Sequence, residues 1–203
     1  MLRIKSKYKI GKRLGPAVFE QCQTQKFALS QARSASTKKG GGRGGSDYGR
    51  QLLEKQRVRF TYGLTERKLS NYVQAAYVEA NPSTTLHRFL ETRLDNAAYR
   101  AGFVKTRRAA RQLVSHGHVT VNGIRSTSPS HQLKKGDAIE VRHASRKSPL
   151  FSHLGSPEAT SAGVPAWLTA EPALMKAVVT GDPSYAPGEA ALDYKVVFEF
   201  YSR

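Results

Sequence analysis

Residues 93–123 decide the fold, and they read RLDNAAYRAGFVKTRRAARQLVSHGHVTVNG. Apolar residues recur at helical spacing through the first part of this stretch and just before it, which predicts a helix over residues 86–100 that ends at Gly102. Thr106 is predicted to cap a second helix that runs to His116 and closes at Gly117. Two short helices therefore follow one another in the middle of the chain.

A β-hairpin is predicted directly after the second helix. Residues 118–121 and 124–127 flank the pair Asn122-Gly123, and an Asn-Gly pair between two such runs favours a tight two-residue turn. Residues 138–142 alternate apolar and polar side chains and predict a further strand. Two helices packed on a short antiparallel sheet indicate a small module of the α+β class.

The second helix of this module separates into two faces. At about 100° per residue, one face gathers three arginines together with two hydrogen-bonding side chains, and the opposite face carries the apolar residues needed for packing. Guanidinium groups match the oxygens of phosphate and keep their charge when partly desolvated. We therefore predict that this face binds nucleic-acid phosphate through Arg107, Arg108, Arg111, Gln112 and Ser115, with His116 and His118 beside it; the alternative is a solvated helix face.

Outside the module, the pattern predicts helices over residues 48–60 and 66–80. Residues 145–166 have the composition of a loop, and a short helix is expected from Trp167 to Val178. The β-branched and aromatic run from Tyr194 to Tyr201 predicts a strand.

Residues 1–45 are basic, polar and rich in glycine toward their end. We expect this segment to lack the apolar surface for a fold of its own and to become ordered on a partner. Gly40, Gly42 and Gly45 match a dinucleotide-binding pattern, but no preceding strand or βαβ unit accompanies them. A flexible backbone that lies against phosphates is the preferred interpretation.

Positive charge is abundant but unevenly distributed. The 203 residues include 33 Lys and Arg against 15 Asp and Glu, a net charge of +18. Residues 1–60 and 101–150 carry this excess, and residues 151–203 are acidic. Nucleic acid, an anionic membrane surface or an acidic protein would each neutralise such a chain, and two separate basic regions favour one large nucleic acid.

Other function classes are disfavoured by what the sequence contains. It has no run of about 18 apolar residues that would span a membrane, and its basic N-terminus lacks the apolar segment of a secretory signal. The single cysteine, Cys22, allows neither an internal disulfide nor a zinc site built from cysteines. These features are consistent with a reducing, intracellular compartment.

The central stretch also resembles a known family. Its motifs Arg93–Phe103, Thr106-Arg107, Ala110–His118 and Val121–Gly123 closely resemble the RNA-binding module of the fourth small-subunit ribosomal protein. Further similar segments follow the family's order, and together they cover most of residues 46–203: Ser46–Gly49, Leu53–Gln56, Tyr62-Gly63, Pro165–Leu168 and Phe198–Arg203.

The resemblance implies four parts: a basic extension over residues 1–45, a helical domain over 46–85 completed by 160–203, an RNA-binding domain over 86–150, and a C-terminal segment, 151–203, that packs back on the helical domain. It implies a protein that binds a multi-helix junction of small-subunit rRNA early in assembly. It also implies a place where mRNA enters, beside neighbouring ribosomal proteins, and an influence on decoding accuracy. Many relatives hold zinc through four N-terminal cysteines, whereas this chain has one, so we expect no metal and no other cofactor.

From the residue pattern and the resemblance together, we predict an extended set of RNA-binding residues. Besides those on the second helix and beside it, the set comprises Lys38, Lys39, Arg43, Tyr48, Arg50, Lys55, Arg59, Arg93, Asn96 and Asn122. The expected location is the cytoplasmic ribosome, with an organellar ribosome as the alternative, and mRNA is a further possible partner.

Two rival functions share the same module. Pseudouridine synthases and a tRNA synthetase carry it beside a catalytic domain, and Arg93-Leu94-Asp95 echoes the synthases' catalytic triplet. Here that triplet lies inside the binding module, where we expect Asp95 to orient an arginine or cap a helix, and no second catalytic domain is evident. A stand-alone RNA-binding stress factor would not require the matching helical and C-terminal segments. His116 and His118 as metal ligands would lack an evident third ligand.

Overall fold

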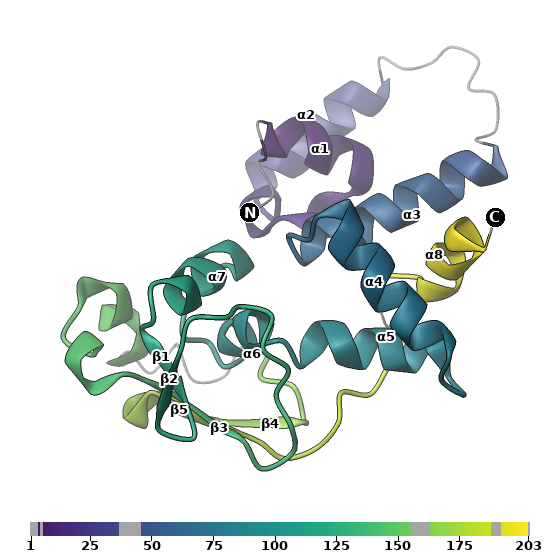
Figure 1. Ribbon diagram of the computed structural model, residues 1–203. Coiled ribbons are helices and arrows are strands. Elements are labelled where there is room, and N and C mark those ends of the chain that lie inside the picture. The colour runs from purple at the N-terminus through teal and green to yellow at the C-terminus, as the bar shows by residue number, and fades with distance from the viewer. Residues whose placement is uncertain (1–3, 5, 37–45, 156–162, 188–191, 203) are drawn as a thin grey trace. The chain divides into compact units, whose positions relative to one another are not determined.

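The computed structural model describes residues 4, 6–36, 46–155, 163–187 and 192–202. The chain divides into two compact units (Figure 1). We call residues 1–83 and 186–203 the helical unit, and residues 84–185 the sheet unit. Helices and an antiparallel sheet occur together, which confirms the α+β class.

The helical unit is built around α3 (Asp47–Thr61), α4 (Glu66–Tyr77) and α8 (Tyr194–Tyr201). Ser46 caps α3 by accepting a hydrogen bond from the Gly49 amide at 3.2 Å, and Thr65 caps α4 in the same way. The apolar side chains of Val58, Leu69 and Val73 are buried between these helices. The two predicted helices of this region are therefore present.

The C-terminal segment differs from its prediction, because residues 194–201 form the helix α8 and not a strand. Asp193 caps the helix by accepting hydrogen bonds from the amides of Lys195 and Val196. Tyr194, Val197 and Phe198 are buried, and this spacing of three and four residues places them on one helical face. Packing against α3 thus overrides the β-propensity of the individual residues.

The N-terminal segment also differs from its prediction over residues 7–36. It forms α1 (Lys7–Leu14), two 3₁₀ turns (Pro16–Val18 and Glu20–Cys22) and α2 (Gln25–Ser36). Widely spaced apolar residues meet in a small core, namely Leu14, Val18, Phe19, Cys22 and Phe27. Burial raises the pKa of the Cys22 thiol, although the charge of Lys7 opposes this. The glycine-rich stretch, with Lys38, Lys39 and Arg43, lies outside the described residues.

The described part of the sheet unit forms a five-stranded antiparallel sheet in the order β2-β1-β3-β5-β4 (Figure 1). They are β1 (Val119–Val121), β2 (Ile124–Ser126), β3 (Ala138–Val141), β4 (Leu168–Glu171) and β5 (Lys176–Val179). Asn122 and Gly123 have φ angles of 50° and 80°, as a tight turn of the favoured hairpin type requires. The predicted hairpin and third strand are confirmed.

Strands β4 and β5 replace the helix that was expected from Trp167 to Val178. Buried and more exposed residues alternate along β5, and Ala177 pairs with Ile139 of β3. Because these strands extend the sheet, the segment that completes the helical unit is 186–203 rather than 160–203.

The helix expected over residues 86–100 is divided into α5 (Pro82–Glu91) and α6 (Leu94–Arg100). At the break, Arg93 is extended and forms a β-bridge with Gln132. The Leu94 amide donates to the His131 carbonyl at 2.9 Å, and the Leu133 amide donates to the Thr92 carbonyl at 2.9 Å. A segment about forty residues further along the chain therefore interrupts the helix.

The core of the sheet unit lies between α6, α7 (Arg107–Ser115) and the sheet. Leu94 and Ala98 of α6, Leu113 and Val114 of α7, and Ile139 of β3 are among its buried residues. Among the described residues, no helix has the length and apolar character needed to cross a membrane.

Candidate nucleic-acid interface

Helix α7 has the two faces that the sequence predicts. Thr106 caps it by accepting a hydrogen bond from the Ala109 amide at 3.1 Å. The face made by Ala110, Leu113 and Val114 is buried in the core. The opposite face exposes the side chains of Arg108, Gln112 and Ser115 and leads to the exposed His116. Packing on one side thus fixes which polar side chains reach solvent on the other.

Two arginines of this face are held by α6 and are only partly exposed. The Arg107 Nε donates to Asn96 Oδ1 at 2.9 Å, and its guanidinium lies 4.4 Å from the centre of the Tyr99 ring. Arg111 Nη1 lies 3.9 Å from Asp95 Oδ2. These contacts restrict the two guanidinium groups to defined positions, whereas Arg108 projects from the surface and forms no ion pair with a described residue.

Asn96 connects Arg107 to a buried carboxylate. Its Nδ2 donates to Glu91 Oε2 at 3.0 Å, while its Oδ1 accepts from Arg107. Glu91 also accepts two hydrogen bonds from Arg100, from Nε at 2.8 Å and from Nη2 at 3.0 Å. A continuous polar network therefore runs from Arg100 to the arginine face of α7.

Arg93 and Asn96 are corrected from predicted RNA contacts to internal residues. Arg93 is fully buried, and it donates two hydrogen bonds to Asp95, from Nε at 2.9 Å and from Nη2 at 2.7 Å. Asn96 is 2% exposed. Asp95 does orient an arginine, as expected. Because arginine and asparagine are hydrophilic, the sequence did not indicate that these two side chains are buried. Their burial follows from the break between α5 and α6.

The predicted residues of the helical unit have different environments. Lys55 is corrected in the same way, because it is buried, lies 2.8 Å from Glu66 Oε1 and sits over the Phe200 ring at 4.1 Å. Arg59 is also paired with Glu66, at 3.1 Å. Tyr48 and Arg50 are exposed on α3. The structure thus places two of these four side chains at the surface.

Burial alone would raise the pKa of Glu66, but hydrogen bonds from Lys55, Tyr201 and Arg59 lower it below its ordinary value. The carboxylate stabilises the packing of α3, α4 and α8 because it joins side chains from all three helices.

The hairpin positions the remaining predicted residues. His118 Nδ1 lies 2.9 Å from Ser145 Oγ, and the rings of His116 and His118 are 6.0 Å apart. Asn122 is exposed, but both ends of its amide are bonded: Nδ2 donates to Asp137 Oδ1, and Oδ1 accepts from the Ala138 amide. Its side chain therefore joins the hairpin turn to the start of β3.

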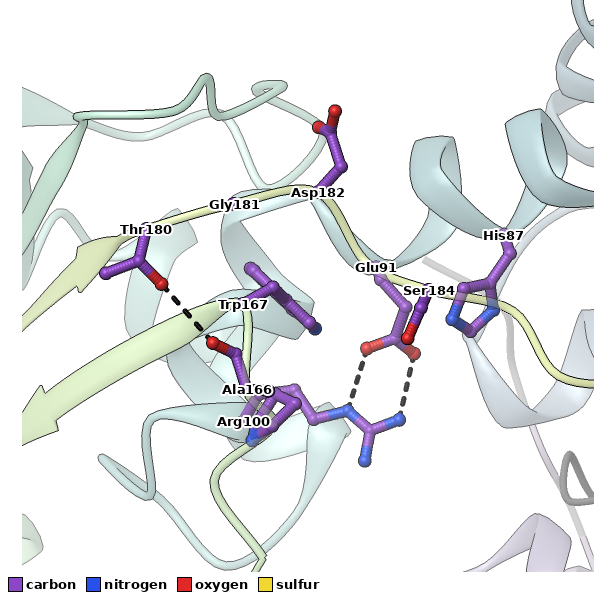
Figure 2. Close-up of a pocket in the computed structure, with 10 residues that line it drawn as sticks. His87, Glu91, Arg100, Ala166, Trp167, Thr180, Gly181, Asp182 and Ser184 are labelled. Carbon is purple, nitrogen blue, oxygen red and sulfur yellow. Dashed lines mark hydrogen bonds and ion pairs between the residues drawn. The ribbon is translucent and has the colours of Figure 1, made fainter.

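A cavity of about 400 Å³ in the sheet unit is lined by His87, Glu91, Arg100, Pro165, Ala166, Trp167, Thr180, Gly181, Asp182 and Ser184. Figure 2 shows the Glu91 carboxylate facing the Arg100 guanidinium inside it. Burial lowers the pKa of His87, partly offset by the charge of Glu91. Because Glu91 accepts hydrogen bonds from two side chains, this carboxylate serves the structure of α5 and α6.

Metal ligands do not gather in the described part of the chain. No group of three or more His, Cys, Asp or Glu side chains there is arranged to hold a metal ion.

The predicted set of RNA-binding residues did not include two arginines of the hairpin region. Arg125 is exposed on β2, and Arg142 directly follows β3. Each follows an apolar strand residue within the basic region 101–150, and these two features are the sequence signals that point to a shared surface.

Comparisons with known proteins extend over nearly the whole chain. A family profile described as the S4 domain matches residues 92–139, and one described as the ribosomal protein S4/S9 N-terminal domain matches residues 3–91. The small ribosomal subunit protein uS4 of Corynebacterium kroppenstedtii is 45% identical over 163 residues, which cover 78% of this chain and 79% of that protein. The protein of that name from Oleidesulfovibrio alaskensis is 38% identical over 203 residues, which cover 98% and 97%.

Proposed function

The chain belongs to the ribosomal protein S4 family, and we propose that it is a structural constituent of the small ribosomal subunit that binds small-subunit rRNA directly. The observation that carries this proposal is the polar face of α7. Arg107 and Arg111 are held in place by α6, and Arg108 projects beside them and forms no ion pair with a described residue. Fixed guanidinium groups suit the phosphates of a folded RNA.

The finer parts of the proposal follow from the family. The protein binds a multi-helix junction of the rRNA, acts early in subunit assembly and influences decoding accuracy near the side where mRNA enters, beside other ribosomal proteins. Its site is the cytoplasmic ribosome. The basic residues 1–60 and 101–150 supply two regions that can contact one large RNA.

The proposed role is binding and not catalysis. The relatives bear the name of a ribosomal protein. Asp95, the residue that echoes a catalytic aspartate, accepts two hydrogen bonds from the buried Arg93. Both carboxylate oxygens are therefore engaged in holding the start of α6, which favours a structural role for this side chain.

Two measurements test the proposal. Sedimentation of a cell extract should place the protein with the small subunit, and a soluble pool alone would contradict the ribosomal role. In filter binding, the affinity of the purified protein for folded small-subunit rRNA should fall steeply with salt, with a log–log slope of about 0.7 to 0.9 in magnitude for each phosphate contacted. A slope near zero would contradict direct phosphate binding.

A further inference from the structure

A group of two arginines and two histidines lies at the end of α7, beside the predicted arginine face. We call His116, His118, Arg125 and Arg142 the cation cluster. They come from different segments: the end of α7, the start of the hairpin, strand β2 and the residue after β3. The fold brings these segments together because β1 pairs with both β2 and β3.

Arg125 is held flat against the backbone at the end of α7. Its Nη2 donates to the His116 carbonyl at 3.3 Å. Gly117 has a φ of 73°, and a Cβ at this position would lie 2.7 Å from Arg125 Cζ. The glycine therefore permits both the backbone turn and the close approach of the guanidinium.

Arg142 and His118 are joined on the other side of the cluster. The Arg142 amide donates to the His118 carbonyl at 2.8 Å, and the His118 ring contacts Ser145. Arg142 Nε is buried and has no hydrogen-bond partner in the described structure. A buried guanidinium nitrogen without an acceptor is costly, and an anion would satisfy it.

No internal carboxylate balances these charges within the described residues. None of the ion pairs formed there includes Arg125 or Arg142. Glu140, on the strand that precedes Arg142, is paired with Lys176 and Arg146.

The geometry points to an oxyanion site in the cation cluster that takes a phosphate group through Arg125 and Arg142, with His118 as a third donor. This proposal rests on the proposed function only for the source of the phosphate group. That source is either an RNA phosphodiester or a free anion. The cluster extends the α7 surface past the end of the helix, onto the hairpin.

Occupancy of this site is coupled to protonation of His118. Burial lowers the pKa of His118, and the positive charges of His116, Arg142 and Arg125 lower it further. These three groups face it from α7, from the segment after β3 and from β2, and Ser145 is its uncharged neighbour. A bound phosphate reverses the local charge and raises this pKa, so the affinity for an RNA phosphodiester, whose own charge is constant near neutral pH, should increase as the pH falls toward and below the ordinary histidine value of 6.5.

The direct test is a titration of the full-length, isotope-labelled protein with inorganic phosphate, followed by nuclear magnetic resonance. We expect saturable shifts at His118 and Arg125 and a raised pKa of the His118 ring. Arg125→Gln should abolish saturation and Arg125→Lys should retain it, whereas Lys135→Gln is a matched exposed control. Because Arg142 is partly buried, the variant tested at this position is Arg142→Lys, which keeps the positive charge. Absence of saturation in the wild type, or equal saturation in Arg125→Gln, overturns the site.

An rRNA-binding assay then identifies the source of the phosphate. For an RNA phosphodiester, Arg125→Gln should weaken binding roughly five- to hundredfold and reduce the salt slope by about one unit. Saturation by inorganic phosphate with unchanged rRNA binding supports a site for a free anion. Failure of the wild type to bind rRNA contradicts the proposed function, while the phosphate titration still decides the site.

Discussion

The sheet unit uses arginine in two opposite ways. Beside α6, Arg93 and Arg100 face the carboxylates of Asp95 and Glu91, and both acids are almost completely buried. In the cation cluster, Arg125 and Arg142 have no described carboxylate partner. The difference indicates that the position of the acid, and not the residue type, decides whether an arginine is paired inside the fold or has no described carboxylate partner.

The most severe test of this comparison removes one partner of the buried pair. Asp95→Ala should lower the free energy of unfolding by about 3–5 kcal/mol, because it leaves the Arg93 guanidinium buried without a counter-charge. Urea unfolding at neutral pH measures the change. The double variant Arg93→Met with Asp95→Leu should recover most of the loss. A loss below about 1 kcal/mol for Asp95→Ala would show that water or another group replaces the carboxylate.

The buried face of α7 provides the next largest effect. Leu113→Ala should lower the free energy of unfolding by about 2–5 kcal/mol, because it opens a cavity in the core. Binding of rRNA should decrease only in proportion to the unfolded fraction, which circular dichroism measures in the same buffer. A variant that melts normally but binds poorly would place Leu113 at the RNA surface.

The exposed face of the same helix should behave in the reverse way. Arg108→Ala should change stability by less than about 0.5 kcal/mol and weaken rRNA binding by about 1–3 kcal/mol, with a salt slope lower by about one unit. Arg67→Ala, on the exposed surface of α4, is the matched control for loss of one charge. Equal effects in the two variants would show that only overall charge matters.

Arg107→Ala should combine the two kinds of effect. It removes the hydrogen bond to Asn96 and the contact with Tyr99, so a stability loss of about 0.5–1.5 kcal/mol should accompany weaker rRNA binding. Thermal melting and filter binding on one preparation separate the two. A variant with unchanged melting would show that α6 does not hold this arginine in solution.

Glu66 is an intermediate case, since its half-exposed carboxylate pairs with Lys55 and Arg59. Its pKa is lower in the folded protein, so its contribution is present above the ordinary value of 4.5 and is lost as the pH falls through and below that value. Solvent screening limits the contribution to about 1 kcal/mol. Glu66→Gln should therefore be less stable than the wild type at pH of about 7, and the difference should shrink as the pH falls below 4.5. A constant difference across this range would contradict the assignment.

Local sequence signals predicted the centre of the chain well. The capping residue Thr106, the apolar spacing of α7 and the Asn122-Gly123 pair each act over a few residues, and the structure has the expected element at each place. The RNA-binding role of individual side chains stays a prediction. The structure reduces the number of candidate side chains at the surface, because Lys55, Arg93 and Asn96 lie in the interior.

The incorrect predictions share one physical cause, which is contact between distant segments. Residues 194–201 have strand propensity but pack as a helix on α3. The helix predicted over residues 86–100 is interrupted at Arg93, because residues 131–133 form a β-bridge and backbone hydrogen bonds with residues 92–94. The N-terminal apolar residues are too sparse to show a period, yet their side chains meet in one core.

By itself, the sequence determined the charge of the chain, the two-helix and hairpin centre, and the face of α7 that carries arginine, since these depend on composition and short-range periodicity. Only the tertiary structure decided which cationic side chains are paired inside the fold and which remain available to a ligand. Lys55 meets Glu66 of the next helix, Arg107 meets Asn96 of α6, and Arg125 meets the end of α7. Such pairings join separate elements, and a charge acquires its role from the group that the fold places opposite it.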